Sequence, residues 1–345
     1  MLIITLPISK SIANRLLVRS ALRGDLLSLP TNNLPEDVRV LYNALAHPTD
    51  QVNIGNCGTA MRFLTAYLAQ KEGTTTLLDG NDRMRQRPIG VLVDALRLMG
   101  ADIAYLQQEG YPPLRISGRR LHGTTIHIPK AESTQFISAL LLINDCLDGT
   151  LTIQTDIRSP YITMTQRVLQ GNITMEYDWS SAAFWYEYIA LHTQPTILLQ
   201  GLSLHTIQGD AIVAQHFESL GVTTTETPQG VLLSHNHVPL PRTLTIDFTA
   251  CPDLYPALYV TTLRLGIPLH SLGTERLQYK ESDRLQAFTN LHTDTSFYPS
   301  QHDHRVAMAL LSADIQTDDL ACIAKSYPLF YPQLCELKSS YHAEE

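Results

Sequence analysis

The sequence predicts an α/β protein built from several similar units of strand and helix. Short runs typical of strands alternate with longer segments of helical periodicity along the 345 residues. A helix, a glycine and a short strand recur in that order, as in "HFESLGVTTTET" and "TLRLGIPLHSL". Several strand segments alternate between polar and apolar residues. This argues against a doubly wound parallel sheet, whose central strands are buried on both faces.

The individual elements follow from periodicity and turn residues. In "RPIGVLVDALRLMGADIAYL", apolar residues recur at helical spacing until Gly100 ends the helix and a strand begins. We expect strands at 2–6, 74–80, 101–106, 113–118, 124–129, 151–155, 195–201, 222–227, 231–235, 244–248 and 268–272. We expect helices at 11–22, 36–46, 59–70, 88–99, 134–145, 162–169, 180–192, 209–220, 254–265, 282–291, 304–313 and 326–337.

Composition sets limits on the class of protein. With 44% hydrophobic and 17% charged residues, the chain suits a globular protein of about two domains. General binding of nucleic acid needs a basic surface, and this chain has a net charge of −8, so we expect no nucleic-acid partner. No apolar run is long enough to span a membrane, and no signal peptide is recognisable. The five cysteines are scattered without a CxxC pair, so we expect a cytoplasmic protein without disulfides or zinc.

Cations gather at predicted helix starts or in the turns before them. In "SKSIANR" (9–15), Lys10 and Arg15 reinforce the positive end of a helix dipole, which suits an anion. Capping by Ser9 or Ser11, with solvated cations, explains this stretch about equally well. The same placement recurs along the chain at Lys10, Arg15, Arg62, Arg87, Lys280, Arg284, Arg305 and Lys325. Several such helix starts facing one cleft would attract a ligand with several negative charges.

Three further stretches place polar groups in similar positions. In "NDRMRQRPIG" (81–90), Arg83, Arg85 and Arg87 alternate, so on an extended segment they would point the same way and could bind carboxylate or phosphate. "GNCGTAMR" (55–62) is a glycine turn before a helix, but it lacks the spacing of a Walker loop. "ESTQFISALLL" (132–142) opens a strongly apolar helix with three polar residues, of which capping explains one.

Carboxylates suited to proton transfer accompany these cations. Asp253 begins an apolar helix, and Glu281 belongs to a charged group with Lys280 and Arg284 at the next predicted helix start. The His-Asp-His sequence at 302–304 could suggest a metal, but two histidines without a nearby third ligand are a weak signal, so we expect none. The residues by themselves therefore indicate a transferase or lyase acting on small polyanions, with no metal or cofactor.

Ten motifs in sequence order resemble one known family. They are "SKSIANR", "GNCGTAMR", "RMRQRPIGVLVDALRLMGADI", "YPPLRISG", "STQFISALLL", "SPYITMT", "DWSSAAFW", "KESDRL", "DHRVAMAL" and "AKSYP". Together they resemble the 5-enolpyruvylshikimate-3-phosphate synthases, an enolpyruvyl transferase family. The resemblance implies a two-domain α/β fold in which repeated βαβαββ units surround a pseudo-threefold axis. It places residues 1–8 and 178–345 in one domain and 9–177 in the other, with the active site in the cleft.

The resemblance also implies the reaction and its residues. Phosphoenolpyruvate would give its enolpyruvyl group to the 5-hydroxyl of shikimate 3-phosphate, with release of phosphate. Asp253 would be the base for the hydroxyl, and Glu281 and Lys10 the candidates for protonating the methylene carbon. Shikimate 3-phosphate would be bound by Lys10, Ser11, Arg15, Ser133, Thr134, Gln135, Tyr161, Asp253 and Lys280. Phosphoenolpyruvate would be bound by Lys10, Gly58, Arg87, Gln135, Arg284, Arg305 and Lys325. We expect a monomer.

The chain departs from the family pattern in several places, including Thr134, Arg158, Arg276 and Phe63. Ile8 stands where the family usually has glycine. The connections between "TQRVLQ" and "YDWSS" and between "LQAFTNLH" and "HDHR" are very short, where family members carry additional strands. Loss of those strands would leave incomplete sheets with exposed edges.

Two alternative functions remain open at this point. The related transferase acting on UDP-N-acetylglucosamine shares the fold and the donor, but it uses a cysteine in a mobile loop, whereas Cys57 lies inside a helix-start motif here. A shortened, inactive homologue that only binds anions is the other alternative.

Overall fold

The computed structural model describes residues 2–30, 32–130, 133–171, 173–193 and 196–342. The chain forms two compact units, which are described separately. Unit 1 comprises residues 1–10, 30–36 and 175–345, and unit 2 comprises residues 11–29 and 37–174. None of the helices in the described ranges has the length and apolar character needed to cross a membrane.

Unit 2 contains one complete βαβαββ unit. Its elements are β2 (Gln51–Asn53), α3 (Gly58–Ala69), β3 (Thr75–Asp79), α5 (Gly90–Leu98), β4 (Asp102–Tyr105) and β5 (Leu114–Ser117). The strands lie in the order β2-β3-β5-β4, with β2 and β3 parallel and β5 antiparallel to both of its neighbours. The α5–β4 junction is the one that the Gly100 signal predicts, and Gly100 has a φ of +99° there.

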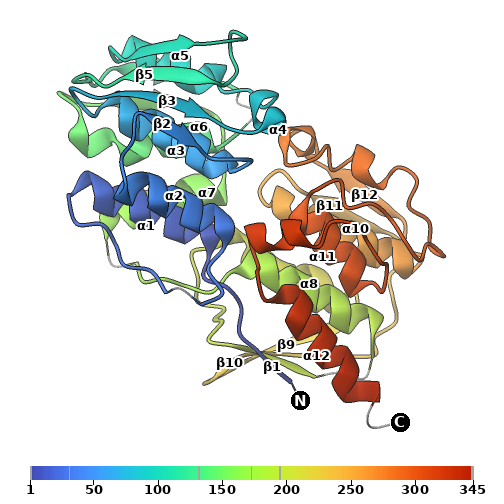
Figure 1. Ribbon diagram of the computed structural model, residues 1–345. Helices are drawn as coiled ribbons and strands as arrows, with labels where there is room; N and C mark the ends of the chain where they lie inside the picture. The colour runs from blue at the N-terminus through green and yellow to red at the C-terminus, as the bar shows by residue number, and fades with distance from the viewer. Residues whose placement is uncertain (1, 31, 131–132, 172, 194–195, 343–345) are drawn as a thin grey trace. The chain divides into compact units, whose positions relative to one another are not determined.

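Unit 1 repeats this arrangement. Its elements are β1 (Leu2–Ile4), α8 (Trp179–Leu191), β8 (Ile197–Gln200), α9 (Val213–Glu218), β9 (Val222–Thr227) and β10 (Gly230–His235). The strand order β1-β8-β10-β9 has the same pattern of parallel and antiparallel pairs as the sheet of unit 2. The first strand precedes the sequence of unit 2, and the other three follow it (Figure 1).

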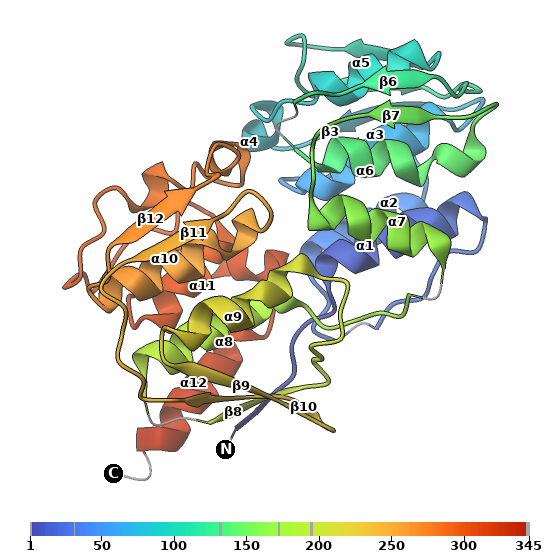
Figure 2. The ribbon, with the colours of Figure 1, turned by 180° about the vertical axis from the view of Figure 1, so that it is seen from behind.

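Each unit also contains a shortened repeat that stops after two parallel strands. In unit 2 it comprises β6 (Thr125–His127), α6 (Gln135–Leu142), β7 (Thr152–Gln154) and α7 (Pro160–Gln170). In unit 1 it comprises β11 (Leu244–Asp247), α10 (Tyr255–Arg264) and β12 (Leu269–Leu272). Figure 2 shows each of these two-stranded sheets. The short connections noted in the sequence follow these elements, at the places where a full βαβαββ unit would add an antiparallel hairpin.

The remaining helices cover the units or connect them in sequence. They are α1 (Lys10–Leu22), α2 (Glu36–Ala46), α4 (Asp82–Arg85), α11 (His304–Ser312) and α12 (Phe330–His342). In unit 1 the core forms around α8, which is buried along almost its whole length. Phe330 packs against Phe184 and Trp185, so α12 is held to this helix by aromatic contacts.

The predicted α/β class and all eleven strands are confirmed, with bounds within two residues of those expected. Residue 195, the expected start of β8, lies outside the described residues. The strand β2 was not predicted, because three residues carry too little periodicity to be recognised.

Several local predictions are wrong. Residues 282–291 form no α-helix: Asp283 Oδ1 accepts hydrogen bonds from the amides of Leu285 and Gln286, and only the short 3-10 helix Gln286–Phe288 follows. Arg83 and Arg85 lie on the helical turn α4 rather than on an extended segment, because Asn81 caps that turn by accepting from the Met84 amide. The last helix begins at residue 330 rather than 326. In the predicted helix 209–220, Gly209–Ile212 form a 3-10 helix and α9 covers only Val213–Glu218. The predicted helix 134–145 ends at residue 142.

Glu187 is an unusual member of the unit 1 core. It lies in α8 and is fully buried. Neither of its carboxylate oxygens has a hydrogen-bond partner among the residues that the structure describes. Burial therefore raises the pKa of Glu187 well above its usual value, and the side chain is best accommodated as the neutral acid.

We predict that Glu187→Met stabilises unit 1, by about 1–3 kcal/mol at neutral pH. Because folding raises the pKa of Glu187, the wild-type protein loses stability as pH rises above the value of an exposed carboxyl group, and the variant does not. The gain should therefore be larger at about pH 7 than at about pH 5. Denaturant unfolding can be followed by fluorescence, since both tryptophans lie in α8.

Glu218→Met provides the control, because Glu218 is exposed at the end of α9. It should leave the free energy of unfolding of unit 1 nearly unchanged at both pH values. A Glu187→Met protein that is less stable than wild type at both pH values would show that the acid is not an unfavourable core residue.

Candidate active site

In unit 1, Asp253 is a carboxylate held by three cations. It lies in the turn Pro252–Leu254, immediately before α10. Oδ1 accepts hydrogen bonds from Lys280 Nζ and Arg284 Nη1, both at 3.0 Å, and Oδ2 accepts one from Arg305 Nη2 at 3.0 Å. Burial would raise the pKa of Asp253, but the charges of these cations outweigh it and hold the pKa well below its usual range. Asp253 is therefore ionised in this arrangement.

Arg284 is the central cation of this cluster and is completely buried. Its Nε donates to Asp303 Oδ2 at 2.9 Å, and Nη2 donates to Asp303 Oδ1 at 3.2 Å and to Glu281 Oε2 at 3.0 Å. With the bond to Asp253, one guanidinium group thus contacts three carboxylates. Burial alone would lower the pKa of Arg284, but Asp303, Glu281 and Asp253 raise it above its usual value. Its charge is permanent and fully compensated.

Lys10 and Lys325 belong to the same cluster. Lys10 is the first residue of α1, and Lys325 ends the short 3-10 helix Ala321–Lys325. Burial lowers the pKa of His304 well below its usual value, and the positive charges of both lysines lower it further. Lys10 also helps to depress the pKa of Asp253. Both lysines are thus close enough to act on groups at the start of α11.

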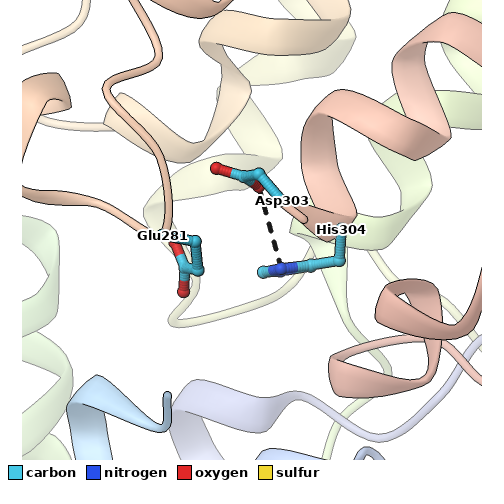
Figure 3. A group of neighbouring side chains, drawn as sticks. All are labelled: Glu281, Asp303 and His304. Atoms are coloured by element: carbon cyan, nitrogen blue, oxygen red, sulfur yellow. Dashed lines mark ion pairs between the residues drawn. The ribbon is translucent and has the colours of Figure 1, made fainter. Parts of the chain in front are cut away.

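Figure 3 shows that Glu281, Asp303 and His304 approach one another at the start of α11. One possible ligand atom from each lies within 4.8 Å of the others, and His304 Nδ1 is 3.8 Å from Asp303 Oδ1. The oxygens of Asp303 already accept from Arg284 and from Ser282, and Asp303 also caps α11 through the Arg305 amide. A metal ion would have to displace the guanidinium group, so these residues fit a cluster of ion pairs better than a metal site.

The other histidine of the His-Asp-His sequence points elsewhere. His302 is exposed, and its Nδ1 lies 2.7 Å from Asp319 Oδ2. Its φ of +56° turns the chain just before α11, so His302 and His304 do not converge on one point.

In unit 2, Arg15 joins the N-terminal parts of three helices. It is buried on α1, where Nη1 donates to the carbonyl of Ser11 at 2.7 Å. Its Nε donates to Thr165 Oγ1 at 2.7 Å, and Nη2 donates to Ser138 Oγ at 3.2 Å and to the Tyr161 carbonyl at 3.1 Å. These bonds fix α6 and α7 beside the start of α1 and leave little of the guanidinium group for a ligand.

A second connection fixes the start of α3 in unit 2. Gln135, the first residue of α6, donates from Nε2 to Thr59 Oγ1 at 2.9 Å. The neighbouring Gly58 faces the guanidinium group of Arg87, and a Cβ built on Gly58 would lie 2.6 Å from Arg87 Nη2. Arg62, one turn along α3, donates to the carbonyls of Gly58 and Pro88 at 3.2 and 3.0 Å. A side chain at position 58 would therefore push the end of the Arg87 side chain away from the helix start.

The predicted site residues thus form two groups, one in each unit. Unit 1 brings together Lys10, Asp253, Lys280, Glu281, Arg284, Arg305 and Lys325. Unit 2 contains Ser11, Arg15, Gly58, Arg87, Ser133, Thr134, Gln135 and Tyr161, at or near the starts of α1, α3, α6 and α7. The sequence argument missed the role of Asp303, which it considered only as part of the His-Asp-His sequence. Its position two residues before Arg305 was the available signal.

Comparison with known proteins shows the family to which this chain belongs. The sequence model of the family "EPSP synthase (3-phosphoshikimate 1-carboxyvinyltransferase)" matches residues 2–172 and 166–293. The chain belongs to the EPSP synthase family. It is 37% identical to the 3-phosphoshikimate 1-carboxyvinyltransferase of Bacteroides fragilis strain ATCC 25285 over 388 residues, covering 96% of this chain and 94% of that protein. The corresponding protein of Syntrophobacter fumaroxidans is 28% identical, with 97% of each chain covered.

Solved structures of the EPSP synthase family and of a related transferase share the fold. The EPSP synthase of Acinetobacter baumannii aligns with a TM-score of 0.70 at 21% identity, covering 97% of this chain and 95% of that one. The enolpyruvyl transferase NikO of Streptomyces tendae aligns with a TM-score of 0.65 at 14% identity, covering 97% and 94%. The predicted two-domain enolpyruvyl transferase fold is confirmed. The match to the Bacteroides protein spans 388 positions, more than the 345 residues here, so that relative has residues that this chain lacks.

We predict that Asp303→Asn destabilises unit 1 by about 3 kcal/mol, because Arg284 loses a buried counter-charge. Urea unfolding followed by the fluorescence of Trp179 and Trp185 measures this change. Asp319→Asn is the matched control. Its partner His302 is exposed, so the loss should stay below about 1 kcal/mol. Equal losses in the two variants would mean that Arg284 does not depend on Asp303.

Proposed function

We propose that this protein transfers the enolpyruvyl group of phosphoenolpyruvate to the 5-hydroxyl of shikimate 3-phosphate and releases phosphate. The observation that carries this proposal is the buried group of cations around Asp253, in a chain that belongs to the EPSP synthase family. Preorganised cations stabilise the negative charge of a phosphate and a carboxylate, because no water has to reorganise around that charge.

Asp253 is assigned as the base that takes the proton of the 5-hydroxyl. Its pKa is depressed while Lys280, Arg284 and Arg305 contact it. Anionic substrates that attract these cations would weaken their hold on Asp253 and raise its pKa toward that of an effective base. The hydroxyl oxygen then attacks C2 of phosphoenolpyruvate, and the carboxylate receives the hydroxyl proton.

Glu281 and Lys10 are the candidates for moving the proton at the methylene carbon. Addition requires a proton on C3, which gives a tetrahedral intermediate with a methyl group. Loss of phosphate from C2 and of a proton from C3 then restores the double bond. Glu281 is nearly buried and bonded to Arg284, and Lys10 acts electrostatically on the same cluster, so both lie within the charged region that contains Asp253.

The remaining assignments concern binding. For shikimate 3-phosphate the proposed ligands are Lys10, Ser11, Arg15, Ser133, Thr134, Gln135, Tyr161, Asp253 and Lys280. For phosphoenolpyruvate they are Lys10, Gly58, Arg87, Gln135, Arg284, Arg305 and Lys325. Because Arg15 already makes four bonds within unit 2, we expect it mainly to hold the helix starts in place.

The deciding experiment is a phosphate-release assay with phosphoenolpyruvate and either acceptor. Release that depends on shikimate 3-phosphate, and not on UDP-N-acetylglucosamine, is expected. The family match and the curated relatives favour this acceptor over the alternative. Absence of turnover with either acceptor, in a protein that is folded by fluorescence and circular dichroism, would reject the proposal in favour of an inactive anion-binding homologue.

We predict that Asp253→Asn lowers turnover at least about 100-fold, because the hydroxyl loses its base. Binding of inorganic phosphate, measured by calorimetry, should be at least as tight as in wild type, since a carboxylate no longer competes for Lys280 and Arg305. Asp294→Asn, at an exposed position, should change neither quantity. Turnover within tenfold of wild type would show that another group is the base.

We predict that Gly58→Ala raises the KM for phosphoenolpyruvate about tenfold or more, because the new methyl group displaces Arg87. Steady-state kinetics at saturating shikimate 3-phosphate measure the effect. Gly90→Ala is the control, since its nearest atom would be 3.5 Å from the added Cβ, an ordinary contact distance. An unchanged KM in Gly58→Ala would remove Arg87 from the binding assignment.

A further inference from the structure

A short strap of chain, residues 30–36, belongs to unit 1 although the residues on both sides of it belong to unit 2. The chain therefore passes between the units at residues 10–11, 29–30, 36–37 and 174–175. Two of these passages enclose the strap. A segment that returns to unit 1 for so few residues needs specific contacts there, because ordering each residue opposes docking by about 1–2 kcal/mol.

Asn33 supplies these contacts, because its side-chain amide acts both as a donor and as an acceptor. Its Nδ2 donates to the carbonyl of Thr5 at 3.3 Å, and its Oδ1 accepts from the amide of Leu329 at 3.3 Å. The residue has a φ of +53°, a left-handed conformation that asparagine tolerates better than most residues. Both the side chain and the backbone conformation are thus suited to this one position.

The partners of Asn33 are themselves fixed to the core of unit 1. Gln333 Nε2 also donates to the Thr5 carbonyl, at 3.2 Å, and Gln333 Oε1 accepts from the Tyr327 hydroxyl at 2.6 Å. That hydroxyl accepts in turn from Trp185 Nε1, at 3.2 Å, on the central helix α8. Asn33 therefore attaches the strap to a network that reaches the interior.

The segments joined at Asn33 lead to proposed ligands of phosphoenolpyruvate. In the sequence, Lys10 lies a few residues after Thr5, and Lys325 lies a few residues before Leu329.

We propose that Asn33 is a positioning residue, which clamps the strap to unit 1 and so keeps the segments of Lys10 and Lys325 in the arrangement that binds phosphoenolpyruvate. The identity of that ligand rests on the proposed function. A clamp of this kind raises the fraction of molecules in the conformation that binds the ligand. Its loss therefore raises the apparent dissociation constant, although the residues that contact the ligand are unchanged.

Asn33→Gly tests the clamp, because glycine keeps the left-handed backbone and removes both side-chain bonds. We expect the KM for phosphoenolpyruvate to rise about threefold to tenfold while kcat stays within about twofold. Asn33→Asp retains the acceptor for Leu329 and loses the donor to Thr5, so it should give an intermediate KM. Asn32→Gly, at the exposed neighbouring position, should behave as wild type.

Hydrogen exchange provides a measurement that does not depend on activity. In Asn33→Gly the amide of Leu329 should exchange at least about tenfold faster than in wild type, because its acceptor is gone. Unchanged exchange would show that the clamp does not exist. Faster exchange with an unchanged KM would overturn the positioning role. A wild-type protein without turnover would reject the proposed function instead, and the exchange measurement would still decide whether Asn33 holds the strap.

Discussion

The buried guanidinium group of Arg284 is the interaction on which the unit 1 cluster depends. It contacts Asp253, Glu281 and Asp303 at once, and these carboxylates come from three different segments of the chain. A buried charge without partners would be strongly destabilising, so the ion pairs must form as the unit folds. The same pairs place the proposed base and one proposed proton donor on either side of a single cation.

This arrangement also explains how an acidic chain can bind anions. The net charge of −8 is spread over the whole protein, whereas the cations Lys280, Arg284 and Arg305 converge on one carboxylate. In the ligand-free cluster the protein's own carboxylates compensate these cations. On the proposed function, a polyanionic substrate would compete with Asp253 for them, and its binding would release the group proposed as the base.

The two units reuse one construction, including its shortened form. Each has a sheet in which a parallel pair is followed by an antiparallel hairpin, and each has a second repeat that ends after its parallel pair. Helix starts at equivalent positions of these repeats carry the proposed site residues, as at Gly58 of α3 and Gln135 of α6. Shortening therefore removes sheet strands and leaves the helix starts that carry the chemistry.

The sequence by itself determined the α/β class, all the longer strands and the proposed ligand types, because periodicity, glycine turns and motifs depend on neighbouring residues. It could not find that residues 282–291 contain only a short 3-10 helix, or that Arg85 lies on a short helix. Only the tertiary structure decided that Asp303 compensates Arg284, that Arg15 is occupied within unit 2, and that Asn33 returns to unit 1. These contacts join residues that are far apart in the chain. Their energies depend on how deeply the groups are buried, which the periodicity of the sequence does not show.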